Sequence, residues 1–336
     1  MSSTPFGPAA TTAIGSLPGE DLREWTKYLL EAVTIPFLPE LPARPYGDML
    51  SRSSGVITSL AMDLQPAGWR LTGGNDTRAS LDQRRARSLL LQDLDVLEEL
   101  AEGYTGPLKL QVTGPWTLAA TVELPRGDKV LADHGARRDL AEALAYGLQG
   151  HIADLRKRVP GAELVVQIDE PGLPAVLAGA VPTASGWGKH RSVDGPGSVD
   201  LLSRVIEAAA PAITVVHCCA ARPPIEVFRK AGAGGVAVDM ALLTEAAWEQ
   251  IAFAVEDNIT LYAGVVPTTG AVPKAEQAAE LLTRRWHEIG LTQKDLVDVV
   301  ITPACGLAGS PSPTDARTRL ELLRRTAEVV GDTAEA

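Results

Sequence analysis

The stretch Ile213-Thr-Val-Val-His217-Cys218-Cys219 is a short apolar run that ends in one imidazole and two thiols. A run of this length and composition is typical of a buried strand. Side chains two positions apart on a strand share a face, so His217 and Cys219 should point one way and Cys218 the other. The stretch therefore predicts a strand that carries chemical groups at its carboxyl end.

Seven further apolar runs of this kind alternate with amphipathic helical stretches along the chain. The eight expected strands cover residues 12–16, 35–38, 108–113, 163–169, 212–218, 235–239, 260–265 and 299–303, and the clearest helical stretches cover residues 80–102, 138–158, 241–257 and 273–289. Runs without polar alternation are expected of parallel strands that are covered on both faces.

The pattern predicts an α/β protein with a (β/α)8 TIM barrel, since strands followed by helical sequence recur eight times. A doubly wound open sheet is the alternative. Residues 1–336 are expected to form a single domain, with a long Pro/Gly-rich loop insertion around residues 40–85 over the mouth of the barrel. The last helix should begin with Ser312 as its N-cap, followed by Pro313.

The composition excludes several classes of protein. Among 336 residues there are 31 Lys and Arg against 42 Asp and Glu, a formal net charge of −11. That balance argues against nucleic acid or an anionic membrane as a partner. No apolar run approaches the roughly 20 residues that span a bilayer. The first residues show no secretory signal, so a cytoplasmic location is expected.

Three cysteines are too few for a disulfide framework, and in a reducing compartment they are buried, catalytic or metal-bound. Cys305 follows the last expected strand, and Asp239 closes the strand of residues 235–239. The ends of parallel strands in a barrel meet at one rim, so His217, Cys219, Cys305 and Asp239 could form a tetrahedral Zn2+ site. The alternative interpretation is a core histidine beside two small buried thiols.

Five motifs occur in an order that is characteristic of one family. They are Ala13-Ile14-Gly15-Ser16, Val112-Thr113-Gly114-Pro115, Gln167-Ile168-Asp169-Glu170-Pro171, His217-x-Cys219 and Pro303-Ala304-Cys305-Gly306-Leu307. In these motifs the chain resembles the C-terminal catalytic barrel of cobalamin-independent methionine synthase, and the short "core" methionine synthases that consist of little else. The resemblance covers nearly the whole chain.

The resemblance implies a barrel of the type that uroporphyrinogen decarboxylase also has, with zinc held by His217, Cys219 and Cys305. It implies that the homocysteine carboxylate binds at Ile14, Gly15 and Ser16, and that Asp169 holds the homocysteine amino group. The chemistry agrees, because a Gly-Ser turn presents N–H groups to a carboxylate and an aspartate pairs with an ammonium group.

The chain departs from the family at three places. Asp239 stands where the family has a glutamate zinc ligand, and Thr269 stands near the place of a family histidine. A family glutamate that helps to bind the amino group is replaced near Ser51, for which Asp48 or Asp63 could compensate.

These observations predict a methyltransferase that moves a methyl group to the sulfur of homocysteine, giving methionine. The donor is a methylcorrinoid protein or 5-methyltetrahydrofolate; a corrinoid leaving group needs no proton, so the missing histidine favours the corrinoid. The alternatives are a zinc-dependent alkyltransferase acting on another small thiol and a zinc-binding protein without activity. A decarboxylase is disfavoured because residues 1–22 contain no arginine for a tetrapyrrole cleft.

Overall fold

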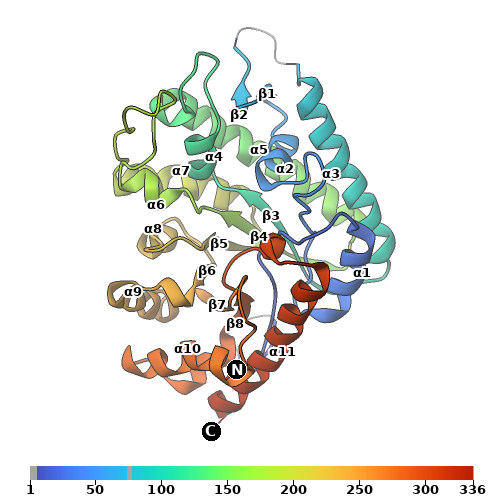
Figure 1. Ribbon diagram of the computed structural model, residues 1–336, viewed down its shortest axis with the longest axis vertical. Helices are drawn as coiled ribbons and strands as arrows, with labels where there is room; N and C mark the ends of the chain where they lie inside the picture. The colour runs from blue at the N-terminus through green and yellow to red at the C-terminus, as the bar shows by residue number, and fades with distance from the viewer. Residues whose placement is uncertain (1–5, 74–77, 336) are drawn as a thin grey trace.

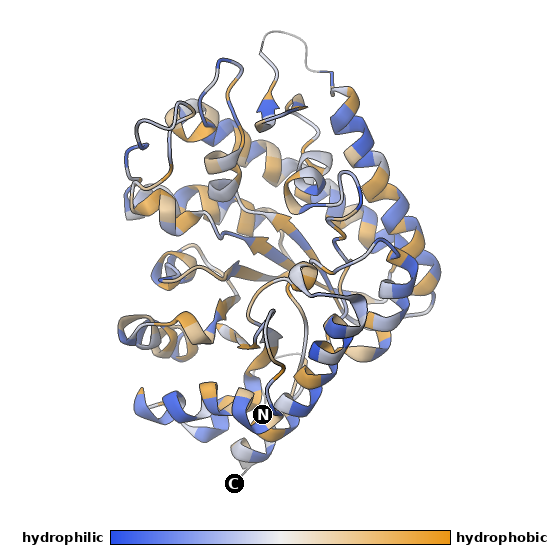
Figure 2. Ribbon diagram, in the orientation of Figure 1, coloured by the Kyte–Doolittle hydropathy of each residue, from blue (hydrophilic) through white to orange (hydrophobic). Residues whose placement is uncertain are grey.

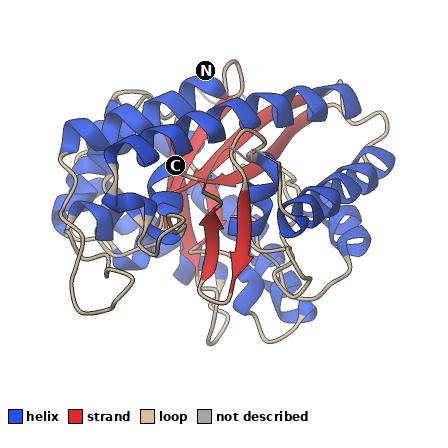
Figure 3. Cartoon of the chain, turned by 90° about the horizontal axis from the view of Figure 1, so that it is seen from above, coloured by secondary structure: helices blue, strands red, loops and turns tan. Residues whose placement is uncertain are grey.

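A curled, parallel six-stranded sheet forms the centre of the computed structural model, which describes residues 6–73 and 78–335 (Figure 1). The strand order follows the chain: β3 (Gly106–Thr113), β4 (Ala162–Asp169), β5 (Ile213–Cys218), β6 (Gly235–Asp239), β7 (Thr260–Val266) and β8 (Val300–Pro303). Helices lie along the outer side of these strands (Figure 3). The six strands coincide with six of the eight expected apolar runs, and the carboxyl ends of all six lie at one edge.

The helices turn their apolar faces toward the sheet and their charged faces outward (Figure 2). They are α1 (Leu22–Ala32), α2 (Met49–Val56), α3 (Leu81–Leu100), α4 (Pro115–Thr121), α5 (His134–Arg158), α6 (Leu173–Leu177), α7 (Gly195–Ala208), α8 (Ile225–Lys230), α9 (Glu245–Glu256), α10 (Ala275–Glu288) and α11 (Pro313–Glu335). The predicted start of the last helix is confirmed, because the Asp315 N–H donates to Ser312 Oγ at 3.1 Å. None of the helices in the described ranges is long and apolar enough to cross a membrane.

The first two expected strands are not regular strands. Instead of a ladder, isolated parallel bridges occur: Thr11, just before the first segment (residues 12–16), pairs with Ile301 of β8, and Phe37 in the second segment (residues 35–38) pairs with Lys109 of β3. In the second segment Pro36 has no N–H to donate to a neighbouring strand, and Pro39 follows directly, so a regular ladder is interrupted there. The first segment contains no proline. A third bridge joins Ser16 to Glu40, so the two segments also contact each other.

The insertion expected around residues 40–85 contains α2 and an antiparallel hairpin of β1 (Met62–Gln65) and β2 (Gly68–Leu71). Residues 74–77 of the expected loop lie outside the described residues. Helix α2 contacts the carboxyl end of β3, where the Thr113 N–H donates to Ser53 Oγ at 2.8 Å and Thr113 Oγ1 donates to the Met49 carbonyl at 3.0 Å. The insertion therefore places a helix beside the edge where the strand ends lie.

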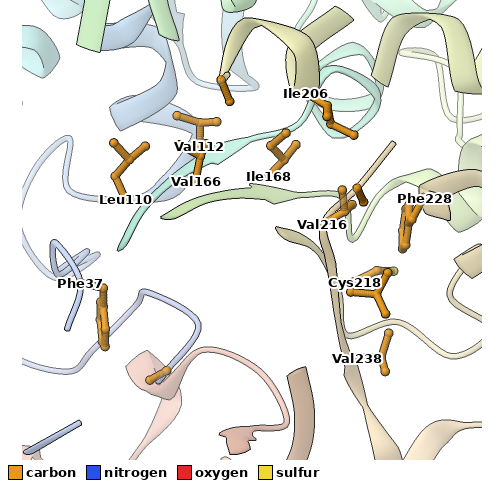
Figure 4. Packing of buried hydrophobic residues seen from close by; sticks show 14 of the residues in the cluster. Phe37, Leu110, Val112, Val166, Ile168, Ile206, Val216, Cys218, Phe228 and Val238 are labelled. Carbon is orange, nitrogen blue, oxygen red and sulfur yellow. The ribbon is translucent and has the colours of Figure 1, made fainter. Parts of the chain in front are cut away.

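Alternate residues of the strands supply two separate hydrophobic cores. The larger one packs between the sheet and the helices and includes Leu110, Val112, Val166, Ile168, Val216 and Val238 (Figure 4). The smaller one lies on the opposite face of the strands and comprises Phe6, Ala10, Ile14, Ile35, Val165, Val215, Ala237, Tyr262 and Val300. On this inner face the side chains nearer the carboxyl ends, such as Gln167, Asp169 and His217, are polar and buried. An apolar inner layer thus supports a polar one.

Candidate metal centre

The end of β5 turns its three chemical groups to two different sides, as the strand period requires. Cys218 is fully buried in the outer core, beside Phe228 and Val238 (Figure 4). Burial raises the pKa of the Cys218 thiol to about 12. His217, which is 3% exposed, points to the inner face, and Cys219 follows directly after the strand. Cys218 is therefore a packing residue, and the other two are available for chemistry.

Cys305 lies in the loop after β8 and completes a group of three ligand types. The side-chain ligand atoms of His217, Cys219 and Cys305 all lie within 4.8 Å of one another. They come from segments almost 90 residues apart, which the parallel sheet brings to one edge. Within the described residues this is the group of His, Cys, Asp or Glu side chains whose arrangement suits a metal ion.

The histidine of this group is oriented by a carboxylate. His217 Nδ1 lies 2.7 Å from Asp169 Oδ1, and β4 and β5 place these residues side by side in register. His217 Nε2 is buried and has no hydrogen-bond partner among the described residues. A carboxylate on one ring nitrogen and a free second nitrogen are typical of a histidine that binds a metal.

The thiols and the imidazole also shift one another's protonation. Burial works against a charged His217, but its hydrogen bond to Asp169 and the negative charge of the nearby Cys305 thiolate raise the pKa to about 9. The hydrogen bond from Cys219, together with His217, lowers the pKa of Cys305 to about 4, whereas the pKa of Cys219 is raised. The group therefore favours one thiolate beside one imidazolium, an arrangement in which a cation can replace protons.

Asp239, expected as a fourth ligand, lies outside this group of three. Its Oδ1 accepts the N–H of Ala241 at 2.9 Å at the start of a 3-10 turn, η2 (Met240–Leu242). Burial raises the pKa of Asp239, and the negative charge of Cys305 adds to the shift. Asp239 is thus near enough to Cys305 to interact electrostatically, while its carboxylate serves as a backbone cap.

The Ile14-Gly15-Ser16 segment is hydrogen-bonded to side chains of β3 and β4 and to the loop that carries Cys305. The Ile14 carbonyl accepts hydrogen bonds from Lys109 Nζ at 2.9 Å and Gln167 Nε2 at 2.7 Å. The Leu307 N–H donates to the Ser16 carbonyl at 2.8 Å, which ties the segment to the loop of Cys305. A side chain at Gly306 would collide with Ser16 Oγ, which explains a glycine after Cys305.

Three buried polar residues of the inner face, Glu40, Lys109 and Gln111, were not singled out by sequence analysis. Glu40 and Lys109 are both buried beside Asp169; burial raises the pKa of Glu40 to about 7 and lowers the pKa of Lys109 to about 8. Gln111 donates to the Leu38 carbonyl at 2.7 Å, while its Oε1 is buried without a partner among the described residues. The available signal was the alternation of polar residues at 109, 111 and 113 in an otherwise apolar strand.

The residues considered as replacements for family positions have other contacts. Asp48 caps α2 through the Leu50 and Ser51 N–H groups, and its Oδ2 accepts from Ser51 Oγ. Asp63 accepts from Gln65 at 2.6 Å. Neither aspartate belongs to the group at the strand ends. Thr269 is exposed on the loop after β7.

The Thr113-Gly114-Pro115 and Asp169-Glu170-Pro171 motifs are in direct contact with each other. Glu170 is fully buried, and its carboxylate accepts the N–H groups of Trp116 and Thr117 at 2.9 and 2.8 Å, at the start of α4. A side chain at Gly114 would collide with this carboxylate. An anion at a helix N-terminus is stabilised by the unpaired N–H groups there. The Thr-Gly-Pro and Asp-Glu-Pro motifs therefore pack against each other behind the inner face.

Fold and site together define an α/β protein that gathers a histidine and two cysteines at the carboxyl edge of a parallel sheet. The sequence matches no protein-family model and no curated protein. Among solved structures, the chain is similar to a B12-independent methionine synthase from Shewanella sp. W3-18-1, determined in complex with selenomethionine. The TM-score is 0.63 at 17% identity, and the match covers 96% of this chain and 98% of that one. At this identity the similarity establishes a shared fold.

Two weaker structural matches have TM-scores too low to establish a common fold. The carboxyl transferase domain of pyruvate carboxylase from Rhizobium etli gives a TM-score of 0.35 at 14% identity, covering 96% of this chain and 48% of that one. An α-L-fucosidase candidate from Bacteroides thetaiotaomicron gives 0.33 at 10% identity, covering 99% of both chains.

Proposed function

We propose that this protein transfers a methyl group to the sulfur of homocysteine, giving methionine, at a zinc centre formed by His217, Cys219 and Cys305. The observation that carries the proposal is the convergence of these three ligand groups within 4.8 Å, with His217 Nε2 buried and unpartnered among the described residues. The shared fold with a B12-independent methionine synthase supports the same reaction class. We further propose that the extended segments at residues 10–17 and 35–41 complete a (β/α)8-type barrel.

The donor set fits zinc. One imidazole nitrogen and two thiolates are ligands that zinc prefers, and three protein ligands leave a fourth position for a substrate group. Bound there, zinc supplies the positive charge that keeps the homocysteine sulfur deprotonated at neutral pH. Cys219 and Cys305 contribute negative charge, which keeps that sulfur electron-rich and suits attack on a methyl group.

The surrounding residues are proposed to orient homocysteine. Asp169 uses Oδ1 for His217 and for Gln167 Nε2, at 2.7 and 2.8 Å, and no hydrogen bond to its Oδ2 occurs within the described residues. That oxygen is available to the substrate ammonium group. Ile14, Gly15 and Ser16, which are tied to the Cys305 loop, are proposed to line the position of the carboxylate. Asp239 is retained as a proposed additional ligand that would have to leave its cap on Ala241.

The donor is proposed to be a methylcorrinoid protein or 5-methyltetrahydrofolate. The loop after β7 holds Thr269 and no histidine, and buried Arg319 fixes it by donating to the Pro267 and Gly270 carbonyls at 2.6 and 2.7 Å. A donor that leaves without needing a proton fits such a loop, which favours the corrinoid.

The experiment is a methyl-transfer assay with homocysteine and each donor in turn, combined with metal analysis. The wild type should retain about one zinc per chain and produce methionine, whereas Cys305→Ala should lose both. Cys218→Ala is the matched control, because it removes a thiol that faces the outer core, and it should keep metal and activity. Metal-replete wild type that is inert with both donors would refute the proposal.

A zinc-dependent alkyltransferase for another small thiol is the second candidate, favoured by the substitution of Ser51 for a family glutamate. Ser51 is buried and donates to Asp48, so it offers the substrate no charge. Competition by other thiols against homocysteine separates the two: if another small thiol is methylated faster, the acceptor is reassigned.

A further inference from the structure

A cavity apart from the group of His217, Cys219 and Cys305 lies between the starts of α5 and α7. It has a volume of about 830 Å³ and Trp116 in its wall. Its basic lining residues are His134, Arg137, Arg138, Lys189, His190 and Arg191, and its acidic ones are Asp194 and Asp200. A basic cavity stands out in a chain whose net charge is −11. We call it the Arg137 pocket.

Arg137 is the residue that points to a ligand. Its side chain belongs to a residue only 8% exposed, and its guanidinium lies over the Trp116 ring, 5.9 Å from the centroid. Across the described ranges no hydrogen bond or ion pair of this guanidinium occurs. Burial lowers the pKa of Arg137, and the negative charge of Asp133 opposes this shift without a hydrogen bond to the guanidinium among the described residues. A largely buried guanidinium with no hydrogen-bonded anion, in the wall of a cavity, is a feature expected of an anion site.

The acidic residues around the pocket are occupied by other groups. Asp194 accepts from the Gly197 N–H at 2.9 Å, and Asp133 accepts from the Ala136 N–H at 2.8 Å, as N-caps of α7 and α5. Asp128 lies 3.1 Å from His190 Nε2, and Asp200 pairs with Arg204 at 3.3 Å. The two N-cap carboxylates offset the partial positive charges of the helix ends, so the positive charge left for a ligand is that of the basic side chains.

We propose that the Arg137 pocket binds the carboxylate or phosphate groups of an anionic small molecule. Its volume is that of a pocket for a complete organic ligand. Helices α5 and α7 follow β3 and β4, so their first turns lie toward the edge of the sheet that carries the metal-ligand group. Resting on the proposed function, the ligand is the anionic part of the methyl donor, either the glutamyl tail of a methylfolate or the phosphodiester of a methylcorrinoid.

Calorimetric titration of the full chain, without homocysteine, tests this proposal. The probes are 5-methyltetrahydrofolate with one and with three glutamates, methylcobalamin, and inorganic phosphate. At least one organic probe should bind, and Arg137→Gln should weaken its binding at least tenfold. Arg156→Gln, which removes an exposed charge from the far end of α5, should leave binding unchanged. Added salt should weaken wild-type binding, as a charge-based site requires.

The probe that depends on Arg137 identifies the source of the anion, since a preference for three glutamates indicates folate and selective methylcobalamin binding indicates a corrinoid. Arg137→Lys, which keeps the charge and loses the paired N–H groups, should bind more weakly than wild type and better than Arg137→Gln. Equal affinity of wild type and a folded Arg137→Gln for every probe would overturn the proposal. Because no turnover is measured, Arg137-dependent binding would stand even if methyl transfer to homocysteine failed.

Discussion

At the scale of single residues, the centre depends on how one histidine is held. His217 Nδ1 forms a hydrogen bond of 2.7 Å with Asp169 Oδ1. Its Nε2 has no hydrogen-bond partner among the described residues, so it remains available for the metal beside Cys219 and Cys305. The carboxylate fixes the ring orientation and increases the basicity of the ligand nitrogen. The pairing arises because β4 and β5 are in register at these positions.

Asp169→Asn should therefore weaken zinc binding about 10- to 100-fold, the usual effect of losing such an outer-shell partner. Competition with a chromophoric chelator measures the affinity. Asp332→Asn, at an exposed position of α11, is the matched control and should bind zinc as the wild type does. An unchanged affinity in Asp169→Asn would mean that the carboxylate does not support a metal ligand.

The residues of the candidate site were predictable to the extent that they sit at strand ends. His217, Cys219 and Cys305 could be found because parallel strands bring their carboxyl ends together. Glu40 was missed because it follows an irregular segment. The sequence of such a segment has no periodicity from which to predict which side chains face inward. Asp239 also ends a strand, yet its side chain accepts the Ala241 N–H. Aspartate often forms such local hydrogen bonds with the backbone, and its position in a strand does not predict them.

At the scale of elements, six strands followed from apolar runs, whereas the first two runs formed isolated bridges. In the second of these runs, Pro36 and the following Pro39 interrupt the ladder that apolar composition alone suggests. The expected insertion contains α2 and a hairpin. These elements were not predicted because they are short, are separated by glycines and prolines, and show no strong hydrophobic periodicity. Short elements held by tertiary contacts are those that sequence periodicity predicts least well.

Contact between α5 and the end of α2 depends on Gly147. A Cβ at this position would collide with the Val56 carbonyl, whereas a Cβ at Gly150 of the same helix would meet nothing within 4 Å. Gly147→Ala should lower the free energy of unfolding by about 1–3 kcal/mol through overpacking. Gly150→Ala should raise it by about 0.5–1 kcal/mol, because alanine favours the helix. Chemical denaturation measures both, and equal effects at the two positions would contradict the close packing.

At the scale of the whole molecule, the acid stability should depend on His151. Burial and the nearby positive charge of Arg52 lower the pKa of this histidine to about 4, with Asp154 acting in the opposite direction. Between about pH 6.5 and 4 the unfolded chain then binds a proton that the folded chain does not. The stability present above pH 6.5 should therefore be lost progressively as the pH falls through this window.

His151→Gln should remove this part of the pH dependence. The free energy of unfolding of the wild type should fall by roughly 1–3 kcal/mol more than that of the variant between pH 7 and 4. His287→Gln, at an exposed position of α10, should keep the wild-type slope. Parallel pH profiles for wild type and His151→Gln would show that this histidine titrates normally.

The layering of the inner face connects the fold to the proposed reaction. Apolar residues such as Val215 and Tyr262 form its lower layer, and buried polar groups lie above them toward the strand ends. The apolar layer supplies stability, while the polar layer places charges where they are shielded from water and interact strongly. His217, Cys219 and Cys305 lie where that polar layer reaches the carboxyl ends of the strands.

X-ray absorption at the zinc edge of the metal-loaded wild type, before and after addition of homocysteine, tests the central claim most directly. The account predicts one nitrogen and two sulfur ligands from the protein, with one further sulfur entering when homocysteine is added. A first coordination sphere without two sulfurs, or one that gains no sulfur from homocysteine, would contradict it.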